Sequence, residues 1–143
     1  MSLFDHLFRL GYSRDLHQQL KGLSADCTGY NGDAIYQITA IVMLATSLCL
    51  MLNYYYGLFN NPRFTHRRVW LLNILVTCSI VGLFAYFNAA SYLPEDKHCI
   101  DIHFTLLDCV LFAFTQMIYT AICCLIWSVL LKWKSVANKK VPF

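Results

Sequence analysis

The chain has 143 residues, of which 58% are hydrophobic and 13% are charged. Soluble domains normally carry about 25% charged residues, so this composition argues against an ordinary soluble globular domain. The mean hydropathy is +0.50. Both values point to a chain whose main solvent is lipid.

Two short amphipathic stretches precede the first long apolar run. Residues 3–10 place apolar side chains at helical spacing. Ser13 is positioned to cap a second short helix, whose apolar stripe would be Leu16, Leu20 and Leu23. Two interpretations remain open. The apolar faces lie in the membrane interface, or they pack on the protein's own spans or on a neighbouring subunit.

Three long stretches contain no charged residue, namely 35–59, 69–93 and 109–131. A helix needs about 20 apolar residues, at about 1.5 Å each, to cross the hydrocarbon core of a bilayer. A very apolar soluble bundle would need polar faces at helical spacing, and these runs lack them. The sequence therefore predicts an all-α polytopic membrane protein with three transmembrane helices and a short amphipathic N-terminal helical region.

We expect a single membrane domain over residues 1–143, without an internal repeat. Its segments, in chain order, are an amphipathic N-terminal segment and loop (1–33), a first span (34–59), a basic loop (60–68), a second span (69–93), an outer loop (94–103), a third span (104–131) and a basic tail (132–143).

Basic and acidic residues are segregated along the chain. The loop after the first span and the tail after the third hold seven basic residues and no acid: Arg63, Arg67, Arg68, Lys132, Lys134, Lys139 and Lys140. Four of the eight acidic residues lie before the first span, and the other four lie between Glu95 and Asp108, from the outer loop to the start of the third span. Because Lys and Arg mark the cytoplasmic side, we predict an outer N-terminus and a cytoplasmic C-terminus, in a bacterial inner membrane. Arg9, Arg14 and Lys21 run against this orientation.

The basic residues of the loop and the tail have three interpretations. In the first, these residues only determine the topology. In the second, they bind anionic lipid at about 1 kcal/mol per residue. In the third, they dock an acidic cytoplasmic protein. The candidates for lipid or partner contact are Arg63, Arg67, Arg68, Lys132 and Lys134.

Aromatic residues gather near the expected ends of the spans. Near the inner ends these are Tyr54, Tyr55, Tyr56, Phe64, Trp70 and Trp133. Amphipathic rings prefer the level of the lipid headgroups, so we predict that these side chains are interfacial anchors.

The seven cysteines fall into two groups. Five lie in or next to the spans, where they are interpreted as small packing residues: Cys49, Cys78, Cys109, Cys123 and Cys124. Cys27 and Cys99 both fall on the predicted outer side, which is an oxidising compartment. We therefore predict a disulfide between Cys27 and Cys99 that ties the N-terminal segment to the outer loop.

Seven polar residues inside the expected spans are candidate functional positions. They are Thr39, Thr46 and Asn53 in the first span, Asn73 and Thr77 in the second, and Gln116 and Thr120 in the third. One interpretation is hydrogen bonding between helices, worth about 0.6 kcal/mol per bond. The other is the lining of a pore, which would need several copies of the chain around one axis.

Asp108 is the one ionisable residue that falls near a span interior. If the third span begins at Phe104, Asp108 is a candidate intramembrane acid. If the apolar core begins at Cys109, Asp108 marks the outer boundary of the span.

Metal and cofactor sites are not expected. His98, Asp101 and His103 could bind a metal together with Asp108, but their spacing matches no standard site. A haem ligand would have to be a His or Met inside a span. No histidine lies in an apolar core of the sequence, which leaves only Met43, Met51 and Met117.

The sequence predicts a small non-enzymatic membrane protein whose partners are the lipid bilayer and other copies of itself, with no nucleic acid. In one version it self-associates into an oligomeric channel or a membrane-perturbing assembly. In another it is the membrane component of a larger complex, with a cytoplasmic protein partner. The alternatives are a haem- or quinone-binding anchor subunit of a redox complex, and a scaffold or assembly factor.

Overall fold

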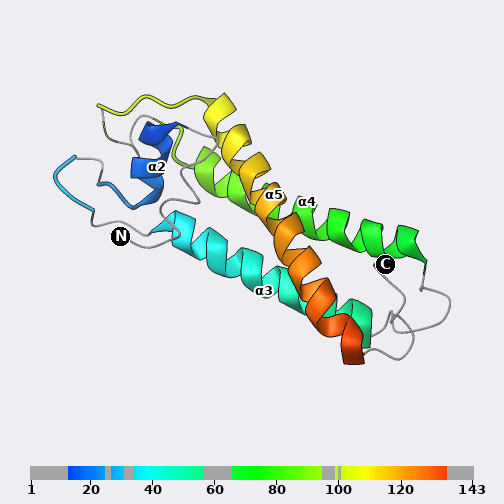
Figure 1. Ribbon diagram of the computed structural model, residues 1–143. Helices are drawn as coiled ribbons and strands as arrows, with labels where there is room; N and C mark the ends of the chain where they lie inside the picture. The colour runs from blue at the N-terminus through cyan, green and yellow to red at the C-terminus, as the bar shows by residue number, and fades with distance from the viewer. Residues whose placement is uncertain are drawn as a thin grey trace. The chain divides into compact units, whose positions relative to one another are not determined.

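The computed structural model describes residues 13–24, 27–30, 34–56, 66–94, 99 and 101–134 (Figure 1). Regular structure in these ranges is entirely helical. The helices are α2 (Arg14–Leu20), α3 (Ile35–Tyr56), α4 (Arg67–Ala90) and α5 (Leu106–Leu131), and a 3-10 turn (Lys132–Lys134) follows α5. The predicted all-α class is confirmed. The first amphipathic stretch, residues 3–10, lies outside the described residues.

Helices α3, α4 and α5 are long and apolar enough to cross a membrane. They contain 22, 24 and 26 residues. An 18-residue stretch within each has a mean hydropathy of 2.0, 2.0 and 2.1, respectively. At 1.5 Å per residue, each helix exceeds the roughly 30 Å of a hydrocarbon core. The chain is therefore a multi-pass membrane protein with three candidate spans. The helix limits differ by a few residues from the expected segments: α4 begins at Arg67 rather than at residue 69, and α5 begins at Leu106 rather than at residue 104.

The chain divides into two compact units, each of which contains part of all three long helices. Unit 1 comprises Met1–Ile41 and Gly82–Gln116. Unit 2 comprises Val42–Val81 and Met117–Phe143. The units have different kinds of interior.

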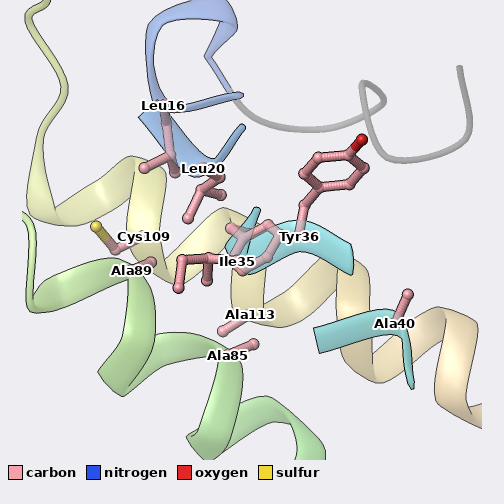
Figure 2. Packing of buried hydrophobic residues seen from close by; sticks show 10 residues of the cluster. Leu16, Leu20, Ile35, Tyr36, Ala40, Ala85, Ala89, Cys109 and Ala113 are labelled. Atoms are coloured by element: carbon pink, nitrogen blue, oxygen red, sulfur yellow. The ribbon is translucent and has the colours of Figure 1, made fainter. Parts of the chain in front are cut away.

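In unit 1, the short helix α2 packs on the ends of the spans. The Ser13 Oγ accepts a hydrogen bond from the Leu16 N–H at 3.3 Å, so Ser13 caps α2 as predicted. Leu16 and Leu20 are completely buried, and they pack in one cluster with Ile35 and Tyr36 of α3 (Figure 2). Of the two interpretations for the apolar stripe of α2, packing on the protein's own spans is the one that the structure shows.

Small residues bring α4 and α5 close together in unit 1. Ala85 and Ala89 lie one turn apart on α4, and Cys109 and Ala113 lie one turn apart on α5; all four belong to the same buried cluster (Figure 2). Small side chains at this spacing let two membrane helices approach closely, which increases the dispersion contacts between them.

The interior of unit 2 is built mainly from large side chains. Its buried cluster consists of Met51, Tyr54, Tyr55, Trp70 and Cys124. Tyr54, Tyr55 and Trp70, which we predicted to be interfacial anchors, are thus buried within the unit. Trp133, in contrast, is 76% exposed.

Candidate functional site

The polar residues singled out in the spans are distributed over both units. Thr39 and Gln116 belong to unit 1, and the other five belong to unit 2. Four of the seven are completely buried: Thr39, Thr77, Gln116 and Thr120. The other three, Thr46, Asn53 and Asn73, are half-buried.

Several of the buried hydroxyls are satisfied by their own helix. The Thr39 hydroxyl donates to the Ile35 carbonyl at 2.8 Å, and the Thr77 hydroxyl donates to the Asn73 carbonyl at 2.7 Å. Each carbonyl lies one turn earlier, in the back-bonding pattern common for Ser and Thr in membrane helices. These groups therefore stabilise the helices to which they belong.

Ser128 connects all three spans in unit 2. Its Oγ accepts a hydrogen bond from the Trp70 indole N–H at 2.9 Å, and it is hydrogen-bonded to the Tyr55 hydroxyl. Tyr55 lies on α3, Trp70 on α4 and Ser128 on α5. Serine is small enough to fit between the two rings while its hydroxyl hydrogen-bonds a polar atom of each.

Further hydrogen bonds cross between helices in unit 2. The Tyr56 hydroxyl donates to the Leu131 carbonyl at 2.6 Å, and the Asn73 amide lies 3.9 Å from the Met51 sulfur. The Cys78 thiol donates to the Met117 carbonyl at 3.4 Å. The expectation of polar contacts between helices is thus realised in unit 2, but mostly by residues that sequence analysis did not select.

Sequence analysis did not select Ser128, although its spacing marks it. It follows Gln116, Thr120 and Cys124 at four-residue intervals on α5, and all four side chains are completely buried. This spacing places Ser128 on the face that Gln116 and Thr120 already define.

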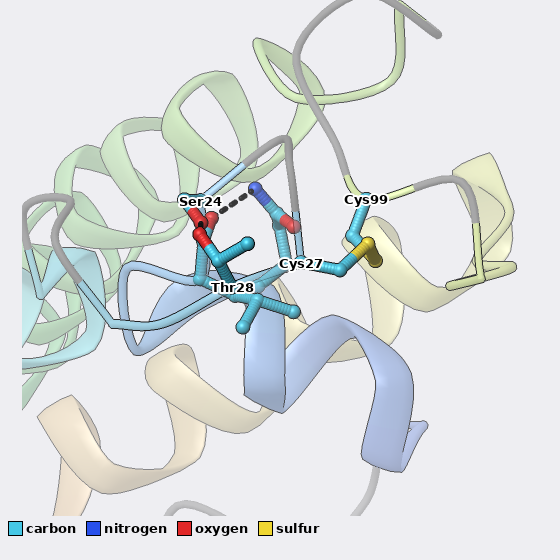
Figure 3. The surroundings of a disulfide bond; sticks show 6 residues. Ser24, Cys27, Thr28 and Cys99 are labelled. Carbon is cyan, nitrogen blue, oxygen red and sulfur yellow. Dashed lines mark hydrogen bonds between the residues drawn. A yellow bond between two sulfur atoms is a disulfide. The ribbon is translucent and has the colours of Figure 1, made fainter.

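The predicted disulfide between Cys27 and Cys99 is present in unit 1 (Figure 3). The two Cα atoms are 5.3 Å apart, within the range usual for a disulfide. Cys27 has a backbone φ of 57°, which is uncommon for a residue with a Cβ. A turn holds it there: the Cys27 N–H donates to the Ser24 carbonyl at 3.0 Å, and the Ser24 N–H donates to the Gly29 carbonyl at 2.9 Å.

Asp108 lies in the first turn of α5 and caps it. Its Oδ2 accepts hydrogen bonds from the Thr105 backbone N–H at 2.8 Å and from the Thr105 hydroxyl at 3.0 Å. A carboxylate three residues into a helix that bonds back to the residue before it is typical of a capping box. This geometry fits the boundary interpretation, and it explains why α5 begins at Leu106.

The groups that might have held a metal or a haem are arranged as follows. Cys27, Cys99 and Asp101 lie close together, but the two sulfurs are joined to each other and are not thiolate ligands. His103 is exposed, and His98 lies outside the described residues. His17 is 94% buried in α2, with its ring 5.8 Å from that of Tyr36. His17 lies outside the three spans, and the burial of its side chain against Tyr36 was not predicted from the sequence.

The candidate basic contacts lie at the ends of the helices of unit 2. Arg67 and Arg68, in the first turn of α4, are exposed, and Lys132 is half-buried after the end of α5. Arg63 and the side chain of Lys134 lie outside the described residues. The sequence places seven basic residues and no acid in unit 2, three between 42 and 81 and four between 117 and 143, and it places all eight acids in unit 1.

No protein-family model, no curated protein and no solved structure matches the chain. The residues and their geometry are therefore the basis for a functional proposal.

Proposed function

We propose that the chain is a non-enzymatic integral membrane protein that works as the membrane component of a larger complex. The observation that supports this proposal best is the direction of its polar span residues. Thr39, Thr77, Gln116 and Thr120 are completely buried within the single chain. A pore formed by several copies would instead need such residues on an outer face.

The outer faces of the spans are apolar. In an 18-residue apolar stretch of each span, only 33% is buried within the chain. Large side chains such as Ile41, Leu75 and Phe114 are more than 60% exposed. Lipid or another membrane chain covers these faces, and they suit helix packing rather than the passage of ions.

The proposed orientation has the N-terminus outside and the C-terminus in the cytoplasm of a bacterial cell. The basic residues of unit 2 support it through the positive-inside tendency. The disulfide gives independent support, because such bonds persist in the periplasm and are rare in the cytoplasm. The basic ends of α4 and α5 would then face acidic groups of a cytoplasmic partner or of the inner leaflet.

The orientation can be tested with a membrane-impermeant maleimide. His103 precedes α5 and His66 precedes α4, and both are exposed. In intact spheroplasts, we expect His103→Cys to be labelled at least tenfold more than His66→Cys, and both to be labelled equally after permeabilisation. The unsubstituted chain gives the background from its five free thiols. Preferential labelling of His66→Cys would reverse the proposed orientation.

Two measurements test the role as a component of a larger complex: the mass of the purified complex and the leak of ions from vesicles that contain the chain alone. Purified in mild detergent from its native membrane, the chain should occur in a complex whose mass is not a multiple of its own 16.5 kDa. Reconstituted alone in vesicles, it should give no ion leak above that of empty vesicles.

Matched variants distinguish an oligomeric channel from a membrane component of a larger complex. Thr46 and Asn53 are half-buried on α3, and Ala45 is an exposed neighbour. A leak that falls in Thr46→Leu and Asn53→Leu but not in Ala45→Leu, together with a pure homo-oligomer, would establish a channel and overturn the proposal.

A further inference from the structure

A groove of about 260 Å³ lies on unit 2 between α3 and α4. Leu50 and Tyr54 line it from α3, and Val69, Leu72, Asn73 and Val76 line it from α4. The α4 residues recur at three- and four-residue spacing, so they form one face of that helix. The groove is open to the outside of the chain, because Leu72 is 61% exposed and Val76 is 43% exposed.

A pair of arginines precedes the first α4 residue that lines the groove, and Arg68 lies one turn before Leu72 on the same face of the helix. Arg67 and Arg68 are exposed in the first turn of α4, directly before Val69. From Arg68 to Val76 the helix rises about 12 Å at 1.5 Å per residue. A ligand that filled the groove could therefore extend from the level of the guanidinium groups into the apolar part of the span.

Unit 2 has no acidic residue of its own to balance these charges. The sequence contains no Asp or Glu between residues 34 and 94, and none after Asp108. The counter-charge must therefore come from unit 1 or from another molecule. At the ends of membrane helices, the most abundant anions are the phosphates of lipid headgroups.

We propose that the groove, together with Arg67 and Arg68, binds one anionic phospholipid. An acyl chain occupies the apolar groove along α4, and the phosphate is bound by the guanidinium groups at the start of the helix. Guanidinium groups match phosphate oxygens with paired hydrogen bonds. An anionic phospholipid matches both parts of this surface: its hydrocarbon tail fits the apolar groove, and its negative headgroup fits the arginines. The inference goes beyond the proposed function, because it does not depend on any protein partner.

The test is native mass spectrometry of the full chain in detergent, with phosphatidylglycerol and phosphatidylcholine of identical acyl chains. We expect one tightly bound phosphatidylglycerol, and weaker binding of phosphatidylcholine. The double variant Arg67→Gln, Arg68→Gln should weaken phosphatidylglycerol binding about 25-fold, at about fivefold per charge. It should weaken phosphatidylcholine binding much less, because the choline group already neutralises the phosphate of that lipid.

Filling the groove tests the position of the acyl chain. Val76→Trp places a ring in the groove and should weaken both lipids at least tenfold. Leu75→Trp is the matched control, because Leu75 is 64% exposed but does not line the groove; it should bind both lipids like the unsubstituted chain. In the unsubstituted chain, the preference for phosphatidylglycerol should also fall as salt is raised, a result that does not depend on any variant folding.

Three results would overturn the proposal. The first is phosphatidylglycerol binding that survives loss of both arginines. The second is equal loss of lipid in Leu75→Trp and Val76→Trp. The third is a dimer of the unsubstituted chain that Val76→Trp dissociates without a change in bound lipid, which would assign the groove to a second copy of the chain.

Discussion

Replacing Cys27 and Cys99 together with serine is expected to loosen the packing of α2 in unit 1 and to lower the free energy of unfolding by up to about 4 kcal/mol. The disulfide joins residues separated by 72 positions, and the loss of loop-closure entropy for a loop of this length gives about 4 kcal/mol. This value is an upper limit, because helices held in the membrane already restrict the reduced chain. Leu16 and Leu20 would then be held only by their own packing.

Hydrogen exchange measures this effect locally. In the double variant, amides of residues 16–20 should exchange at least tenfold faster, while those in the middle of α4 should be unaffected. Cys49→Ser is the control, because Cys49 is a free and exposed cysteine. Unchanged protection of α2 in the double variant would mean that the apolar cluster alone fixes this helix.

Ser128→Ala is expected to have the second largest effect, a loss of about 1–3 kcal/mol from the free energy of unfolding. The substitution removes the acceptor of the Trp70 N–H and the partner of the Tyr55 hydroxyl. Leaving a buried polar group unsatisfied costs about 1–3 kcal/mol in soluble proteins. Hydrogen bonds in membrane proteins average nearer 0.6 kcal/mol, so two of them define the lower end of the range.

Unfolding in mixed micelles gives the measurement, and Ser79→Ala gives the control. Among the described residues, the Ser79 hydroxyl bonds only to the Leu75 carbonyl of its own helix, so its removal should change stability by less than about 0.5 kcal/mol. The losses in Tyr55→Phe and Ser128→Ala should be less than additive when the two are combined, because each single variant already removes the hydrogen bond between these side chains. Strictly additive losses would show that Tyr55 and Ser128 are not coupled.

The three spans and the disulfide could be predicted from the sequence for simple physical reasons. A charge-free run of more than 20 residues has few stable states other than a membrane helix. Successive loops of a multi-pass protein lie on alternate sides of the membrane, so the segment before the first span and the loop after the second share a compartment. Cys27 and Cys99 lie in these two segments, and they are the only two cysteines of the sequence outside the apolar runs. The start of α5 was less predictable, because it depends on the hydrogen bonds between Thr105 and Asp108.

Which side of each span faces inward could not be predicted. Tyr54, Tyr55 and Trp70 were expected at the interface, and the structure buries them. In soluble proteins, the hydrophobic effect turns the apolar face of a helix inward. This driving force is absent in lipid, because lipid tails are as apolar as a protein interior. The rotation of each helix is set instead by shape and by specific hydrogen bonds such as those of Ser128. The groove of unit 2 depends on the same packing, and no sequence pattern marks it.

The bonds that polar side chains make within their own helix bear on how the chain is integrated during synthesis. Thr39, Thr77, Ser79 and Thr115 each donate to a carbonyl four residues earlier in the same span. A helix that satisfies its own hydroxyls can leave the translocon sideways into lipid by itself, without waiting for a neighbour to cover them. The three spans can therefore be released in turn, and the contacts centred on Ser128 need form only after the last of them has left the ribosome.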